Sequence, residues 1–180
     1  GSETTIDMKS FSAWSLSSAP LGYFPEAELN NDLRYGFGRA RIAWYVIDPL
    51  FLRNNSLTPE HIRSNPDLQS SHYVREVFEN DIFPQKETPN NIPTNISVLN
   101  IAYYPTLRGP YNYDSENINP DGSLKDPQSR WGGIMREIQS NDFEAANIEF
   151  IEFWLMDPYV EDSNNPGGDL FINLGNISED

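Results

Sequence analysis

The run Ile42-Ala-Trp-Tyr-Val-Ile47 decides the fold class, because it consists almost entirely of β-branched and aromatic residues and stops at Asp48-Pro49. These residue types favour extended backbone, and a short apolar run that ends at Pro or Gly is typical of a strand. Working outward along the chain, similar runs occur at 97–104, 148–156 and 170–174, with a weaker alternating run at 10–16. We therefore predict a chain built mainly from short strands.

The run at 148–156 is apolar on both faces of a strand, apart from Glu149 and Glu152. A strand with this pattern is expected at the centre of a sheet that is covered on both sides. Trp44 and Trp154 lie within strand runs and are predicted core residues, since a large ring supplies much of the buried area that a core needs.

Helical signals are few. Thr58-Pro59-Glu60 resembles a helix start, and Ser71 is placed to cap a second helix that would bury Tyr73, Val74, Val77 and Phe78. Long polar connections at 84–96, 108–130 and 157–169 separate the apolar runs. We predict a single mainly β domain over 1–180, an antiparallel β-sandwich of the jelly-roll, galactose-binding kind with long loops and one or two short helices.

Composition narrows the classes of function. The formal charge is −15, with 12 basic and 27 acidic residues, which argues against binding nucleic acid or an anionic membrane surface. The 38 % hydrophobic and 13 % aromatic shares predict a folded chain. Cysteine is absent, and no apolar run approaches the about 20 residues of a membrane-spanning helix. The two ends are those expected of a soluble fragment excised from a longer chain.

Catalytic motifs are missing from the sequence. Glu149 and Glu152 are three residues apart on a predicted strand and would point to opposite faces, whereas Glu149 and Asp157 would lie about 26 Å apart, too far for a glycosidase pair. His61 and His72 have no metal-site spacing, and neither a nucleophile elbow nor a P-loop is present. We predict no catalytic or cofactor-binding residues and no enzyme, although distant segments could still bring two carboxylates together.

Two loops carry oxygen-rich residues that suit calcium, at 114–121 and at 162–169. Asx-turns explain the same residues, so the prediction is no cofactor, with a structural calcium as the alternative. The loop Arg108-Gly-Pro-Tyr-Asn-Tyr-Asp114 is the candidate partner-contact loop, with Arg108, Tyr111 and Tyr113 as its contact residues. Arg and Tyr are enriched where proteins bury contact surface.

Several segments in order along nearly the whole chain resemble the SprA/Sov family, the outer-membrane translocon of the Bacteroidota type IX secretion system (gliding motility and secretion proteins). They are 39–49, 102–105, 108–114, 130–136, 147–158 and 173–180. The resemblance implies a giant outer-membrane β-barrel through which folded cargo leaves the periplasm. This chain would be a domain of that translocon outside the bilayer, since it lacks repeated lipid-facing strands.

The resemblance implies a structural or interaction domain in protein secretion and, in gliding species, in gliding motility. Its expected partners are the rest of the barrel, its accessory subunits and secreted cargo. The extracellular side of the outer membrane is favoured over the periplasmic side, because outer-membrane barrels keep their long insertions outside. The alternative is a carbohydrate-binding module of a cell-surface protein, since 12–16 and 147–156 also resemble carbohydrate-binding jelly rolls.

Overall fold

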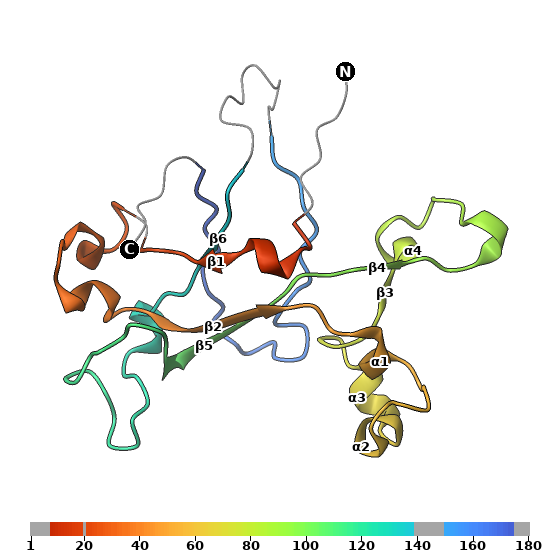
Figure 1. Ribbon diagram of the computed structural model, residues 1–180, viewed down its shortest axis with the longest axis horizontal. Helices are drawn as coiled ribbons and strands as arrows, with labels where there is room; N and C mark the ends of the chain where they lie inside the picture. Colours follow the sequence, from red (N-terminus) through yellow and green to blue (C-terminus); the bar gives the residue numbers. More distant parts are fainter. Residues whose placement is uncertain (1–7, 20, 139–149, 175–180) are drawn as a thin grey trace. The chain divides into compact units, whose positions relative to one another are not determined.

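The computed structural model describes residues 8–19, 21–138 and 150–174 (Figure 1). The chain divides into two compact units. Among the described residues, unit 1 holds 8–11, 45–100 and 150–165, and unit 2 holds 12–19, 21–44, 101–138 and 166–174. The expectation of a single domain over 1–180 stays a prediction.

The strands of the described chain form three two-stranded sheets. They are β1 (Ser15–Leu16) with β6 (Ile134–Met135), β2 (Ala40–Tyr45) with β5 (Asn100–Arg108), and β3 (Val77–Phe78) with β4 (Asn95–Ile96). β1 pairs antiparallel with β6, Ser15 opposite Met135, and β3 pairs antiparallel with β4, Val77 opposite Ile96. The mainly β prediction agrees with these small antiparallel sheets, whereas the jelly-roll sandwich stays a prediction.

β2 and β5 form the longest ladder and confirm two of the predicted strands, at 42–47 and 97–104. The two strands run antiparallel, because the end of β5 lies beside the start of β2. There the Gly109 N–H donates to the Arg39 carbonyl at 3.2 Å. The predicted end of the second run at 104 was wrong, because β5 continues through Pro105 to Arg108. Each strand of a two-stranded sheet has a free edge, and a proline on that side loses no ladder hydrogen bond.

Helices in the described residues are short. The α-helices are α1 (Pro49–Leu52), α2 (Glu60–Arg63), α3 (Pro66–Ser70) and α4 (Glu79–Ile82), and the 3-10 turns are η1 (Phe11–Ala13), η2 (Pro25–Glu28), η3 (Leu33–Gly36), η4 (Pro89–Asn91) and η5 (Pro127–Ser129). None of the helices described is long and apolar enough to cross a membrane. The weak strand predicted at 10–16 is reduced to η1 followed by β1.

The two predicted helix caps have other roles. The α2 helix follows Thr58-Pro59 as predicted, but the Thr58 hydroxyl lies within hydrogen-bond distance of the carbonyl oxygens of Leu50 (2.7 Å) and Arg53 (2.9 Å) and donates its one hydrogen between them, so that it closes the end of α1. Ser71 follows α3, and the residues after it form one turn and then β3. The predicted helix is absent because the β-branched and aromatic pair Val77-Phe78 pairs with β4.

Burial is concentrated in unit 2. The buried apolar residues of the described chain are Ala19, Ala40, Leu124 and Trp131, all in this unit. In the described part of unit 1 only Thr58 is buried. The polar residues buried in unit 2 are Ser18, Arg39, Asn112 and Asp114. The core of unit 2 is therefore small and polar, and polar groups in such a core need hydrogen-bond partners.

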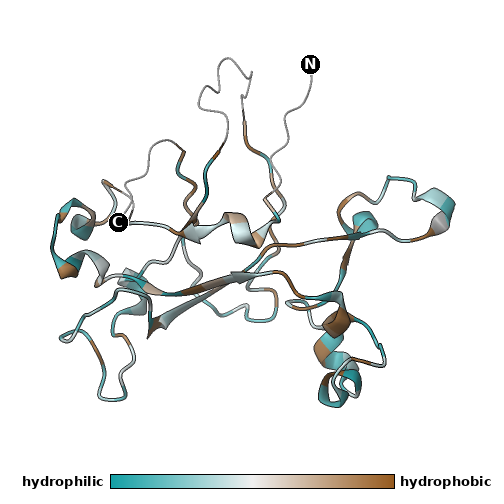
Figure 2. Cartoon of the chain, in the orientation of Figure 1, coloured by the Kyte–Doolittle hydropathy of each residue, from teal (hydrophilic) through white to brown (hydrophobic). Residues whose placement is uncertain are grey.

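The two C-terminal strand predictions were wrong for the described residues, because neither 150–156 nor 170–174 forms a strand. Trp154, predicted as core, has 64 % of its surface exposed, and Trp44 is half-buried. Glu149 lies outside the described residues. Figure 2 shows apolar stretches on both segments, which can be followed by their place in Figure 1. The apolar runs are present, but the described chain provides no partner strand for them.

Candidate functional site

The predicted contact loop begins where β5 ends, in unit 2. A side chain at Gly109 would collide with the Ala40 carbonyl, so the loop passes close to the start of β2. Tyr111 has a left-handed backbone with φ of 60°, which is uncommon for a residue with a side chain and is maintained by the surrounding contacts. Tyr111 is 66 % exposed, and Tyr113 is exposed as well. The structure thus presents both tyrosines at the surface.

Buried hydrogen bonds fix the backbone of this loop. The side-chain amide of Asn112 donates to the carbonyls of Phe37 (2.9 Å) and Arg39 (2.7 Å), and its oxygen accepts from the Asp114 N–H at 3.0 Å. The Arg108 guanidinium donates to the Asp114 carbonyl at 2.9 Å and to the Asn112 carbonyl at 3.4 Å. Arg108 therefore binds the loop from within, while Tyr111 and Tyr113 provide its outer surface.

Arg39 lies beneath the loop and is only 1 % exposed. Its guanidinium donates to the carbonyls of Pro110 and Ser17, each at 3.3 Å. Three aromatic rings surround the guanidinium carbon, with centroids at 5.0 Å (Trp131), 5.7 Å (Tyr111) and 5.8 Å (Tyr35). We call Arg39 and these three rings the arginine cage.

The contacts of the arginine cage offset the high free-energy cost of removing the Arg39 charge from water. Each ring within about 6 Å of a cation contributes about 0.5 to 2 kcal/mol, and the planar guanidinium suits both stacking and hydrogen bonding. Trp131 is joined to β2 through the backbone, since its N–H donates to the Gly38 carbonyl (3.1 Å) and its carbonyl accepts from Ala40 (2.8 Å). The cage thus links β2, the Trp131 segment and the contact loop.

The sequence alone does not single out Arg39 as a site residue. The available signal was alternation, because Arg39 and Arg41 flank Ala40 and lie on the same face of an ideal strand. The structure buries Arg39 and exposes Arg41. Arg39 precedes the first residue of β2 and forms an isolated parallel bridge with Trp131, so that ideal alternation does not apply to it.

A second buried charge, Asp114, closes the loop. Its Oδ1 accepts from the N–H groups of Glu116 and Asn117, each at 3.0 Å, and its Oδ2 lies 3.4 Å from Arg130 Nη1. The Asp114 and Arg130 side chains are 1 % and 5 % exposed. Burial alone would raise the pKa of Asp114, but the backbone N–H groups and Arg130 outweigh burial and lower that pKa.

A pocket of about 520 Å³ opens next to this ion pair and is lined by apolar, acidic and basic side chains. Phe24, Phe37, Glu26 and Arg34 form part of its wall. The Arg130 guanidinium already donates hydrogen bonds to the carbonyls of Phe37 (2.6 Å), Lys125 (3.0 Å) and Asn117 (3.1 Å). The Trp131 indole N–H is buried with no hydrogen-bond partner in the described residues. The pocket offers a mixed-charge wall without a convergent set of free donors.

The two oxygen-rich loops contain Asx-turn contacts. In the first loop, Asp114 accepts backbone N–H groups as above, and Asp121 accepts from the Ser123 N–H at 3.0 Å. In the second, Asp162 Oδ2 accepts from the Asn165 side chain at 3.1 Å. The described residues contain no group of three or more His, Asp or Glu side chains able to hold a metal ion. A structural calcium in either loop stays a prediction.

The remaining predicted residues lie in unit 1. His72 Nε2 is 3.3 Å from the Asp157 carbonyl oxygen, and the Tyr73 hydroxyl donates to the Pro158 carbonyl at 3.0 Å. Trp154 stacks edge-on against Phe83, with ring centroids 5.8 Å apart. His61 is exposed on α2. These contacts attach the 150–158 segment to the rest of unit 1.

No protein-family model matches this sequence, and no curated protein matches it at a significant level. The local geometry is therefore the basis for the functional argument. It offers a loop with two exposed tyrosines on a rigid polar base, and exposed apolar segments whose side chains the described chain leaves in solvent.

Proposed function

We propose that this chain is a structural and interaction domain of a type IX secretion translocon of the SprA/Sov kind, involved in protein export across the outer membrane and, in gliding species, in gliding motility. The observation that carries the proposal is the exposure of the apolar segments 150–156 and 170–174. Isolated soluble domains rarely leave such stretches in water, and large exposed apolar patches are typical of surfaces that bind other proteins.

The contact loop supports the same proposal. Its base is fixed by Asn112 and Arg108, so Tyr111 and Tyr113 are presented at little conformational entropy cost on binding. Tyrosine supplies large contact area with a polar tip, as protein interfaces require. In this proposal the loop touches the barrel, an accessory subunit or cargo, and the sandwich is completed as a jelly roll within the assembled translocon.

The remaining parts of the proposal follow from composition and resemblance. A charge of −15 favours basic protein partners over nucleic acid. We place the domain outside the bilayer of the outer membrane, on the extracellular side, and assign it no catalytic role. These assignments rest on the segments that resemble the family and on the absence of a catalytic motif in the sequence.

The test replaces Tyr113 with Ser in the full-length translocon and measures export of a type IX cargo by cells. Tyr113 is the sharper choice because Tyr111 also packs against Arg39. Export should fall while the fragment 1–180 keeps its melting temperature. Tyr104→Ser is the matched control, an exposed tyrosine of β5 outside the loop. Normal export by the Tyr113 variant, with normal protein level, would remove the loop from the interface.

A second candidate function is carbohydrate binding at a cell surface. The specific observation in its favour is the exposure of Trp154 in unit 1 and of Tyr111 and Tyr113 in unit 2, since sugars stack on exposed rings. A glycan array on fragment 1–180 separates the two proposals. Saturable sugar binding that is lost on changing Tyr111, Tyr113 or Trp154 would favour the module, and absence of binding would leave the interaction domain.

A further inference from the structure

The segment 150–156 of unit 1 combines apolar side chains with solvent exposure. Its exposed apolar residues are Phe150, Ile151, Phe153, Trp154, Leu155 and Met156. On extended backbone, Ile151, Phe153 and Leu155 share one face, and Glu152 lies between Phe150 and Trp154 on the other. A strand that is apolar on both faces belongs in the interior of a sheet with layers on each side.

The backbone of this segment is also unpaired. No N–H or C=O group of 150–156 makes a hydrogen bond within the described parts of the chain, whereas β2, β5 and the other strands have partners. Extended backbone with free donors and acceptors is a template on which another strand can pair. Seven residues span about 23 Å when extended, which is the length of an ordinary strand.

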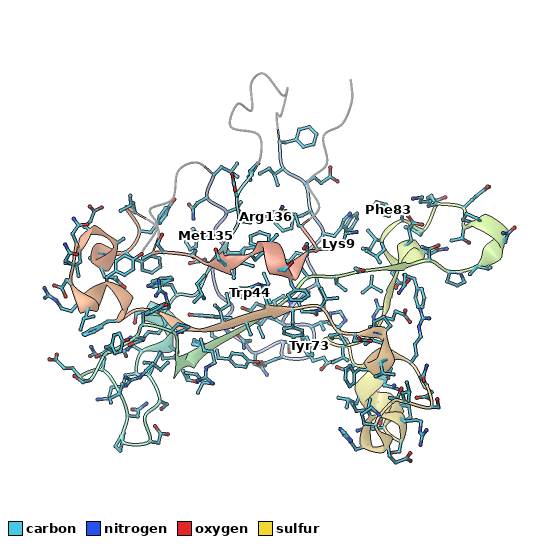
Figure 3. The ribbon with its side chains drawn as sticks, in the orientation of Figure 1. Lys9, Trp44, Tyr73, Phe83, Met135 and Arg136 are labelled. Carbon is cyan, nitrogen blue, oxygen red and sulfur yellow. The ribbon has the colours of Figure 1, made fainter. Side chains whose placement is uncertain are left out.

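Contacts within unit 1 hold one end of the segment and leave its backbone available. Trp154 contacts Phe83, which follows α4, and the carbonyls of Asp157 and Pro158 receive contacts from His72 and Tyr73. Figure 3 labels Tyr73 and Phe83. All of these contacts use rings or carbonyls at or beyond Trp154. Residues 150–153 therefore remain exposed, and their backbone has no hydrogen-bond partner in the described chain.

Charge narrows the choice of partner. From Glu137 to Asp180 the sequence contains no Lys, Arg or His, and acids such as Glu152, Asp157 and Glu161 lie within or just after the segment. A second copy of this chain would bring the same acids together, because like charges opposed across strands are destabilising. An anionic lipid surface would repel them too. The favourable partner is a protein surface bordered by basic side chains.

We propose that residues 150–156 form a donated β-strand, which pairs with the exposed sheet edge of a different polypeptide segment whose rim carries Lys or Arg. Backbone hydrogen bonds would supply register, and apolar pockets on both faces would receive the alternating side chains. The inference rests on the proposed function in that it names the surface that this interaction domain binds. It is tested on fragment 1–180 alone, whereas the proposed function is tested by export in cells, so either can fail separately.

The probe is a cyclic β-hairpin peptide with alternating Val and Lys on its free edge strand. Hydrogen–deuterium exchange of fragment 1–180 should show unprotected amides over 150–156 before addition. On saturation, about every second amide of this segment should gain at least tenfold protection, because an added strand bonds alternate residues. A hairpin whose edge is N-methylated, and one with Glu in place of Lys, should each bind at least tenfold more weakly by calorimetry.

The variant Phe153→Pro tests the segment directly, because proline removes a backbone N–H and disfavours strand pairing. It should weaken binding of the Lys hairpin at least tenfold, whereas Asn164→Pro, in the loop after the segment, should leave binding unchanged. Equal affinity for the N-methylated hairpin, or protection gained outside 150–156, would overturn the donated strand. Equal affinity for the Glu hairpin would contradict a partner whose rim carries Lys or Arg. Concentration-dependent dimers of the fragment in sedimentation would show that the partner strand comes from a second copy of this chain and not from a different polypeptide.

Discussion

Burial in the contact loop at 108–114 and in the segment at 150–156 is the opposite of what their residue types suggest. The loop is polar and Gly/Pro-containing, yet Asn112, Asp114 and the Arg39 beneath it are buried and hydrogen-bonded. The 150–156 segment is apolar, yet it is exposed and its backbone is unpaired in the described chain. The difference shows that burial follows the availability of backbone partners as much as the hydrophobicity of side chains, because an extended run cannot be buried without a ladder.

The largest difference in the free energy of unfolding is expected between variants of two tryptophans. Trp131→Ala should lower the free energy of unfolding by about 3 to 5 kcal/mol, since it removes a buried ring and one wall of the arginine cage. Trp154→Ala should change it by less than about 0.5 kcal/mol, because the ring is largely exposed and packs, among the described residues, edge-on against Phe83. Urea unfolding measures both. Similar losses for the two variants would show that Trp154 is buried in solution, as the sequence pattern predicted.

Arg39 tests whether the loop depends on its buried base. Arg39→Ala should lower the free energy of unfolding by about 3 kcal/mol, because it leaves a cavity among three rings and two carbonyls without donors. Arg39→Met fills the space without a charge and should lose only about 1 kcal/mol, since replacing a buried ion by an apolar side chain is often nearly neutral. Chemical denaturation with matched m-values is the measurement, and equal losses would assign the effect to charge alone.

The contribution of Asp114, in the contact loop, to the free energy of unfolding depends on pH. Its pKa is lowered in the folded state, so its stabilising contribution is present above the unfolded pKa of about 3.9 and is lost as pH falls through the folded pKa. Asp114→Asn should therefore cost about 2 to 3 kcal/mol at pH 7 and progressively less as the pH falls below the unfolded pKa of about 3.9. Urea midpoints across this pH range measure the effect. The control Asp121→Asn changes an exposed carboxylate and should cost less; a pH-independent loss at position 114 would contradict the ionic contribution.

The smallest expected effect separates the two exposed tyrosines. Tyr111→Ser should lower the free energy of unfolding by about 1 kcal/mol, because it removes one ring from the arginine cage. Tyr113 is exposed and is not one of the three rings of the arginine cage, so Tyr113→Ser should change the free energy of unfolding by less than about 0.5 kcal/mol. Thermal melts of both variants of the chain 1–180 measure the difference. If Tyr113→Ser melts earlier than Tyr111→Ser, Tyr113 belongs to the folded base of the loop.

Prediction from sequence succeeded where local preference and pairing coincide. The β-branched and aromatic run at 42–47 became part of β2, and the Pro59-containing start at 58–60 preceded α2. The exposure of Tyr111 and Tyr113 also followed from their place in a loop that begins with Gly109-Pro110. These features depend on a few neighbouring residues, whose preferences act in the unfolded chain as well as in the folded one.

What the sequence by itself determined is the mainly β character, the acidity and the positions of the apolar runs and of the contact loop. Tertiary structure alone decided that Arg39 is buried under Tyr111, that Pro105 lies within β5, and that 150–156 has no partner strand in the described chain. The physical reason is that pairing and cation–ring contacts join residues far apart in sequence, such as Arg39 with Trp131, and no local pattern specifies which segments will meet.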